Sequence, residues 1–140
     1  MELSEHPLIR ELCSLALPAG DYVVTGSGPL LAHGLRNVER DLDVVARGDA
    51  WKAALRLGDP VLPLSGYGCL VSLFGGRIEV FDRWLPGSPG PDAMIEAAEW
   101  VQAIPFSPLG DVLACKERLG RPKDREDARL IRRHLGLPEK

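Results

Sequence analysis

The residues best suited to chemistry are carboxylates within two apolar segments. Asp41 and Asp43 lie in the run Arg40-Asp-Leu-Asp-Val-Val45, and Glu79 lies in Arg77-Ile-Glu-Val-Phe-Asp82. Side chains at positions i and i+2 of a strand share a face, so Asp41 and Asp43 are expected to project together. Two carboxylates so close repel each other unless a cation lies between them, and hard oxygen ligands favour Mg²⁺ or Mn²⁺. The spacing therefore predicts a divalent-metal site.

A third carboxylate would complete such a site. Glu79 is the favoured third ligand, because a charged side chain inside an apolar strand is costly unless it has a partner. Asp82, at the end of the same run, is the alternative, and Glu79 could instead be an outward charge on an edge strand. With three carboxylates, two metal ions about 3.5–4 Å apart could stabilise the attacking and leaving oxygens of a phosphoryl displacement.

A glycine-rich turn precedes the paired aspartates. Gly26 and Ser27 follow the β-branched run 21–25, and Pro29 is expected in the first turn of a helix. A strand that passes through glycine into a helix start presents free backbone N–H groups and the positive end of the helix dipole to an anion. The turn therefore predicts contacts with nucleotide phosphates, with the Ser27 hydroxyl as a further donor; the alternative is an ordinary helix cap.

These motifs resemble those of a known superfamily. The segment Gly26-Ser-Gly-Pro-Leu-Leu-Ala-His-Gly-Leu-Arg36, followed by residues 40–45, resembles the opening motif of the minimal nucleotidyltransferases, which have the polymerase beta-like nucleotidyltransferase fold. Leu113-Ala-Cys-Lys116 and Arg121-Pro-Lys-Asp-Arg-Glu-Asp127 resemble the C-terminal helices of the abortive-infection toxin-like branch, in which a Lys-Asp-x-x-Asp motif lies near the nucleotide. The resemblance spans roughly residues 20–132.

The resemblance implies a role for each matching residue. Asp41, Asp43 and Glu79 would be the catalytic metal ligands. Arg36 and Arg40 are candidate phosphate contacts, although either could only pair with a nearby acid. The residues expected to bind the nucleotide are Gly26, Ser27, Arg36, Arg40, Lys116, Lys123, Asp124 and Asp127. For the last three, a solvated helix start is an equally good interpretation.

The implied activity is transfer of a nucleoside monophosphate from a nucleoside triphosphate to an acceptor hydroxyl, with Mg²⁺ or Mn²⁺. The acceptor could belong to RNA, a protein or a small molecule. The alternative function is a non-catalytic, nucleotidyltransferase-like module that binds a nucleotide or a cognate partner protein, as an antitoxin or regulator would. Other nucleotide sites fit less well, because position 31 is Leu where the dinucleotide-binding pattern needs glycine and no Gly-Lys-Ser/Thr is present.

The elements that would position these residues follow from periodicity and turn signals. Helices are expected over 8–17, 29–35 and 50–57, and strands over 21–25 and 40–46. A brief strand is expected at 61–64, then a hairpin of 67–74 and 77–84 with Gly75-Gly76 as its two-residue turn, a loop at 86–91 and a last edge strand at 101–104. Two helices close the chain, one capped by Ser107 and one starting at Pro122.

This order predicts one α+β domain over residues 1–140, with a small mixed β-sheet flanked by helices and with C-terminal helices. The formal charge of −3 gives no electrostatic reason to expect tight nucleic-acid binding, although Lys and Arg concentrate near the C-terminus. Three widely spaced cysteines argue against a disulfide scaffold or a zinc site, and a reducing cytoplasm is expected. The chain offers no apolar run long enough to span a membrane.

Overall fold

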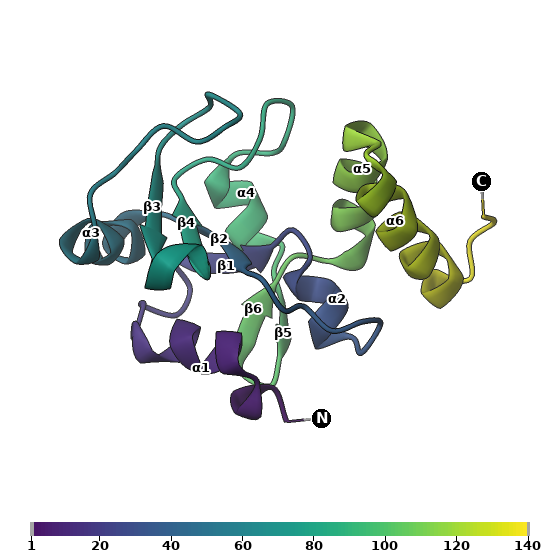
Figure 1. Ribbon diagram of the computed structural model, residues 1–140, viewed down its shortest axis with the longest axis horizontal. Helices are drawn as coiled ribbons and strands as arrows, with labels where there is room; N and C mark the ends of the chain where they lie inside the picture. The colour runs from purple at the N-terminus through teal and green to yellow at the C-terminus, as the bar shows by residue number, and fades with distance from the viewer. Residues whose placement is uncertain (1, 140) are drawn as a thin grey trace.

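A six-stranded mixed β-sheet forms the centre of the computed structural model, which describes residues 2–139 (Figure 1). The order across the sheet is β3-β4-β2-β1-β6-β5, with β1–β6 and β2–β4 parallel and the other pairs antiparallel. The strands are β1 (Tyr22–Thr25), β2 (Leu42–Ala46), β3 (Leu70–Leu73), β4 (Ile78–Phe81), β5 (Glu99–Val101) and β6 (Ile104–Phe106). The predicted α+β class with a mixed sheet and flanking helices is confirmed.

Six α-helices surround the sheet: α1 (Pro7–Ser14), α2 (Gly28–Ala32), α3 (Gly48–Leu57), α4 (Pro91–Glu96), α5 (Leu109–Leu119) and α6 (Pro122–Leu135). Four of them have proline in the first turn, where the missing N–H costs no hydrogen bond. Gly120 and Gly136 end α5 and α6 in the left-handed conformation that glycine adopts most readily. Within the described part of the chain, no helix has both the length and the apolar character needed to cross a membrane.

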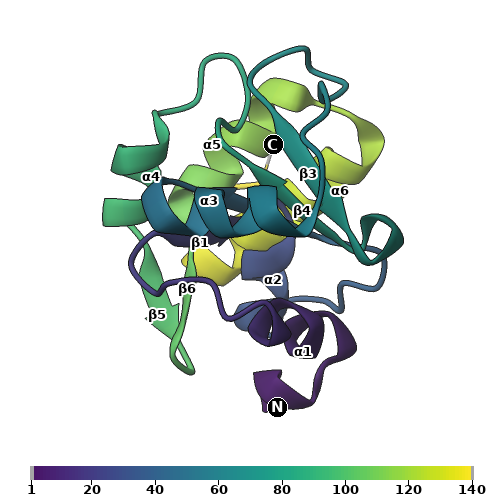
Figure 2. The same cartoon turned by 90° about the vertical axis from the view of Figure 1, so that its left-hand side faces the viewer.

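The two faces of the sheet are covered by different helices. Leu12 of α1 and Ala54 of α3 pack with Val24 and Val44 in the largest core cluster. On the other face, Ile95 of α4 packs with Val23, Val45 and Phe81. Figure 2 looks onto α3, with α1 below it and α5 and α6 behind. Because strand side chains alternate between faces, Asp43 and Glu79 point to the same side as Val45 and Phe81, the α4 side.

The C-terminal helices form a separate layer at one end of the sheet. Leu113 of α5 and Ile131 of α6 pack with Leu30 of α2, so the helix pair is attached through the helix that follows the glycine-rich turn (Figure 1). In this arrangement, the start of α6 faces the side of the sheet that α4 covers. Two sequence motifs far apart in the chain therefore meet at one place, as the ion pair between Arg36 and Asp127, 91 positions apart, also shows.

The expected edge strand over 101–104 is wrong, because those residues hold the turn of a hairpin. β5 ends at Val101 and β6 begins at Ile104. Gln102 and Ala103 between them both have positive φ, 49° and 65°, as a type I′ hairpin turn requires. Neither residue is a glycine or asparagine, so the sequence carries no signal for this turn.

The hairpin of β3 and β4 was expected to have Gly75-Gly76 as a two-residue turn, and this is also wrong. Leu73 pairs with Ile78, so four residues connect the strands and three of them, Phe74–Gly76, form a 3₁₀ turn. Positive φ extends to Phe74, at 53°. The expected strand at 61–64 is reduced to a single bridge between Val61 and Leu70.

Helix starts also differ from expectation. Ser107 does not cap α5: the N-cap residue is Pro108, and no side chain caps this helix. The loop expected over 86–91 ends in α4, a short helix that periodicity did not reveal because it covers the sheet with few apolar residues. Its Ile95 nevertheless reaches the core, where only 7% of the residue is exposed.

The close approach of α2 to β1 leaves no room for a side chain at Gly28. A Cβ atom at this position would collide with Cγ1 of Val24, which is fully buried. Overpacking of this kind costs about 1–3 kcal/mol, so we expect Gly28→Ala to lower the free energy of unfolding by that amount in urea titrations. Gly110→Ala in α5 is the control, because nothing lies within 4 Å of a Cβ there and alanine favours the helix. Equal effects of both substitutions would contradict this packing.

Candidate functional site

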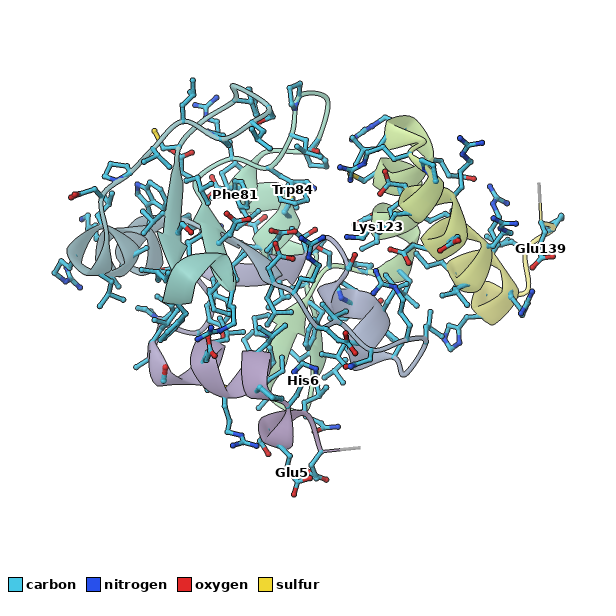
Figure 3. All side chains as sticks on the ribbon, viewed as in Figure 1. Glu5, His6, Phe81, Trp84, Lys123 and Glu139 are labelled. Atoms are coloured by element: carbon cyan, nitrogen blue, oxygen red, sulfur yellow. The ribbon has the colours of Figure 1, made fainter. Side chains whose placement is uncertain are left out.

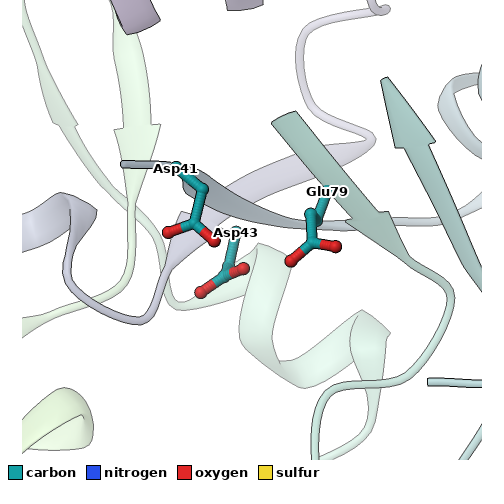
Figure 4. A group of neighbouring side chains, drawn as sticks. All are labelled: Asp41, Asp43 and Glu79. Atoms are coloured by element: carbon teal, nitrogen blue, oxygen red, sulfur yellow. The ribbon is translucent and has the colours of Figure 1, made fainter. Parts of the chain in front are cut away.

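Three carboxylates converge on the α4 side of the sheet, as the sequence predicts. Figure 4 shows Asp41, Asp43 and Glu79 directed into one space, and one carboxylate oxygen from each lies within 4.8 Å of the others. The parallel pairing of β2 with β4 brings this about, because Asp43 and Glu79 are register partners. These three residues, the acidic triad, are all partly buried. Their oxygens are close enough to be bridged by a divalent cation.

The structure places Glu79, and not Asp82, beside the aspartate pair. Asp82 Oδ1 instead accepts a hydrogen bond of 2.8 Å from the backbone N–H of Cys69. A Cβ on Gly68 would lie 2.6 Å from this same oxygen, and the φ of Gly68 is +74°. Asp82 therefore stabilises the chain as it enters β3.

Burial, followed by repulsion within the acidic triad, raises the pKa values of two of its carboxyl groups. The pKa of Asp43 rises to about 7, first because of burial and then because of the charges of Asp41 and Glu79, while Lys116 and Lys123 oppose the rise. Burial and the charge of Asp41 also raise the pKa of Glu79. Near neutral pH, the triad consequently favours either a proton or a cation between its oxygens.

The turn at Gly26 and Ser27, called here the glycine turn, lies against the triad. Gly26 has a φ of +63°, and a Cβ at this position would lie 2.7 Å from Asp43 Oδ2. Both facts require glycine, because any other side chain would be strained and would displace the carboxylate. Within residues 2–139, the N–H groups of Gly26 and Ser27 form no backbone hydrogen bond outside the regular ladders. They are available to an anion beside the triad.

The hydroxyl of Ser27 does not cap α2 but belongs to a charged network. Its Oγ accepts hydrogen bonds from Arg36 Nη2 at 3.1 Å and from Lys116 Nζ at 3.0 Å, and it donates to Asp127 Oδ2 at 3.3 Å. The glycine turn is thereby joined to α5 and α6 through one side chain. We call Ser27, Arg36, Lys116, Asp124 and Asp127 the Asp127 network.

Asp127 is the centre of this network. Arg36 donates to both of its oxygens, at 2.7 and 2.9 Å, and Lys116 Nζ lies 2.8 Å from Oδ2. Only 3% of the Asp127 side chain and 7% of the Lys116 side chain is exposed. Burial alone would raise the pKa of Asp127, but the hydrogen bonds from Arg36 and Lys116 outweigh it and hold the pKa below its ordinary value.

Asp124 forms the second acidic position of the network. Its side chain is fully buried and lies 3.7 Å from Lys116 Nζ. Arg121, which the sequence did not single out, donates to it through Nε at 2.6 Å and through its backbone N–H at 3.2 Å. These bonds hold the pKa of Asp124 below its ordinary value, although burial opposes them. One sequence signal could have identified Arg121: it lies three positions before Asp124, and the two residues form a capping box at the start of α6.

The residues expected to bind the nucleotide thus divide into two groups. Arg36 is paired with an acid, the alternative that the sequence left open, and Lys116 is also paired. Lys123 and Arg40 are exposed and have no hydrogen bond or ion pair with other described residues. Lys123 extends from the start of α6 toward the sheet (Figure 3), and its charge lowers the pKa of Asp43. Among the described residues, Lys123 is therefore a cation near Asp43 that has no competing ion pair.

A pocket of about 640 Å³ adjoins this site, and no sequence motif predicted it. It lies between α4, the segment 84–89 and α5, and we call it the α4–α5 pocket. Segments far apart in the sequence meet at this pocket, and α4 itself was not expected. The position of the pocket could therefore be found only from the tertiary structure. The residues that line it include Thr25, Trp84, Ser107, Asp111, Ala114, Cys115 and Arg118.

The pKa of Asp43 gives a pH-dependent prediction. Its folded value of about 7 exceeds the ordinary value, so the folded state binds the proton more tightly and metal-free protein should lose stability as pH rises from about 4 to about 7. We expect Asp43→Asn to raise the free energy of unfolding by about 1–3 kcal/mol at pH 8 without divalent cations, and to change little at pH 4. Thermal denaturation at both pH values, in chelator, measures this. Destabilisation at pH 8 would contradict the repulsion.

Removal of a carboxylate from the Asp127 network is expected to lower the free energy of unfolding, in contrast to Asp43→Asn. Asp127→Ala leaves Arg36 and Lys116 without their shared carboxylate, and an uncompensated buried charge costs about 3–5 kcal/mol. We expect a loss of that size in urea unfolding. Glu126→Ala, one position away and exposed, should stay within about 0.5 kcal/mol of the wild type. Similar small effects of both changes would show that the network adds nothing to stability.

No protein-family model, curated protein or solved structure matches this chain. The resemblance of its motifs to nucleotidyltransferases therefore stays a prediction. A function has to be argued from the geometry of the acidic triad and the glycine turn.

Proposed function

We propose that the protein is a metal-dependent nucleotidyltransferase that moves a nucleoside monophosphate from a nucleoside triphosphate to an acceptor hydroxyl and releases pyrophosphate. The observation that carries this proposal is the acidic triad, with its oxygens within 4.8 Å, directly beside the glycine turn. The mixed sheet, with Asp43 on β2, Asp41 just before it and the third carboxylate on β4, fits the nucleotidyltransferase fold that the motifs resemble.

The triad fits Mg²⁺ or Mn²⁺. All its donors are carboxylate oxygens, the ligands that hard divalent cations prefer. The pKa of Asp43 is raised first by burial and then by the charges of Asp41 and Glu79, and a bound cation would offset both effects. Asp41 and Asp43 would hold both ions and Glu79 would complete the site of one. When bound, the ions would increase the acidity of the acceptor hydroxyl and offset charge on the phosphates.

Glu79 supports the attack of the acceptor. It lies at the β4 side of the triad, and its raised pKa suits it to receive the proton of the acceptor hydroxyl. The acceptor oxygen then forms its bond to the α-phosphorus while the bond between that phosphorus and the bridging oxygen breaks. The pyrophosphate leaves with the bond electrons.

The glycine turn and Lys123 would hold the leaving phosphates. The N–H groups of Gly26 and Ser27 are available beside Asp43, and Lys123 has no competing ion pair with a described residue. Arg40 is a further candidate for phosphate contact. Arg36 and Lys116 act indirectly, because they hold the Ser27 hydroxyl and Asp127 in place. Asp124 and Asp127 orient these cations in turn.

A non-catalytic module that binds a nucleotide or a cognate partner protein is the second candidate. One observation favours it: the charges of Arg36 and Lys116 are satisfied by Asp127 within the protein, which leaves fewer cations for a triphosphate than an enzyme of this class would use. Such a module would bind without turnover. Transfer of label therefore distinguishes the two functions.

The test uses each α-³²P nucleoside triphosphate with Mg²⁺ or Mn²⁺, and with RNA, protein and small-molecule fractions of a cell extract as acceptors. We expect label on one fraction with wild type and with Asp82→Asn, and at least a hundredfold loss with Asp43→Asn and Glu79→Gln, because each removes a metal ligand. Undiminished transfer by Asp43→Asn would refute the metal assignment. Metal-dependent binding in calorimetry without transfer to any fraction would favour the binding module.

A further inference from the structure

Resting on the proposed function, we infer that the α4–α5 pocket binds the nucleoside part of the triphosphate, its base and ribose. The sheet order fixes where this pocket lies relative to the triad. Asp43 of β2 pairs with Glu79 of β4 on one side and with Thr25 of β1 on the other. Thr25 and Ser107, at the ends of β1 and β6, line the pocket. The pocket therefore lies across Asp43 from Glu79.

The geometry of phosphoryl transfer then assigns the pocket. In an in-line displacement the attacking and leaving oxygens lie on opposite sides of the α-phosphorus, and the nucleoside extends from between them. Glu79 marks the side of the acceptor, while the glycine turn and Lys123 mark the side of the pyrophosphate. On the side of Asp43 that faces β1, the surface is hollowed by the α4–α5 pocket, which Thr25 lines.

The size and chemistry of the pocket suit an uncharged ring and sugar. Its volume of about 640 Å³ falls in the range of small-molecule sites. Trp84 and Cys115 belong to largely apolar walls, and the two charged lining residues, Asp111 and Arg118, have opposite signs. An excess of positive charge, which a polyphosphate would need, is missing from this lining. A nucleoside, with a flat apolar face and polar edges, matches it.

Two contacts hold the walls in place. Arg118 of α5 donates to the backbone oxygen of Gly87 at 3.0 Å and to Ser88 Oγ at 3.4 Å, so it joins α5 to the segment that follows β4. Trp84 packs edge-on against Phe81, with ring centroids 5.1 Å apart, and Figure 3 shows these two labelled rings side by side. The pocket is thus built before a ligand enters, which lowers the cost of binding.

Cys115 provides a reporter within the pocket. The thiols of Cys13 and Cys69 are exposed elsewhere, so the variant Cys13→Ser/Cys69→Ser leaves Cys115 as the single reactive group. Its alkylation by iodoacetamide is followed by mass spectrometry with Mg²⁺ alone, with Mg²⁺ and α,β-methylene nucleoside triphosphates, and with Mg²⁺ and inorganic tripolyphosphate. Calorimetry on the same variant measures whether each compound binds.

We expect the nucleotide analogue, at about ten times its Kd, to slow alkylation about tenfold, because only the free fraction reacts. Tripolyphosphate should bind and leave the rate unchanged. A nucleotide that binds without protecting Cys115, or equal protection by tripolyphosphate, would overturn the pocket assignment and leave the proposed function standing. Absence of any metal-dependent binding would overturn both.

A bulky substitution gives an independent measurement. Ala114 is exposed on α5 and lines the pocket, so Ala114→Trp should fill it without disturbing the core. We expect the affinity for the nucleotide analogue to fall at least about tenfold and the affinity for tripolyphosphate to be unchanged. Lys52→Trp, exposed on α3 at the opposite face of the sheet, is the matched control and should alter neither. Unchanged nucleotide affinity in Ala114→Trp would contradict the inference.

Discussion

Mutual repulsion of three carboxylates is the constraint on which the rest of the site depends. The register of β2 with β4 places Asp43 beside Glu79, and Asp41 lies just before β2. Burial, followed by the charges of Asp41 and Glu79, raises the pKa of Asp43 to about 7. Neighbouring residues reduce the cost of burying the charged Asp43 carboxylate. Gly26 leaves room for the Asp43 carboxylate where a Cβ would collide, and Lys116 and Lys123 offset part of its charge. A structure that needed only a stable strand pair would place apolar side chains at these positions.

The Asp127 network performs a different task, which is to fix the C-terminal helices against the glycine turn. A buried ion pair adds little net stability, because desolvation of the charges offsets their attraction. The network instead fixes the orientation of α6. Asp127 accepts two hydrogen bonds from the planar guanidinium of Arg36 and one from Lys116, and only one placement of α6 satisfies all three. The apolar contacts of Leu30, Leu113 and Ile131 attach the same helices without specifying their rotation so narrowly.

The arrangement of layers explains how a short chain provides both the acidic triad and a pocket. α1 and α3 fully cover one face of the sheet and supply the main core. The short α4 covers only part of the other face, and α5 and α6 stand at its end, so the triad and the α4–α5 pocket lie between them. The largest core cluster and the acidic triad thereby lie on opposite faces of the sheet, and side-chain alternation along β2 separates the two sets of residues.

The sequence by itself determined β1, β2, the helix after the glycine turn and the carboxylates that form the triad. DxD at the start of a strand, a carboxylate inside a later apolar run and a glycine-serine turn are short-range patterns, and strand periodicity is enough to place the two aspartates on one face. Only the tertiary structure decided what depends on distant segments: Glu79 and not Asp82 beside the pair, Arg36 and Lys116 bound to Asp127, and α4 opposite α5. Turns such as Gln102–Ala103 also escaped prediction, because tertiary pairing of β5 with β6 imposes positive φ on residues that do not favour it.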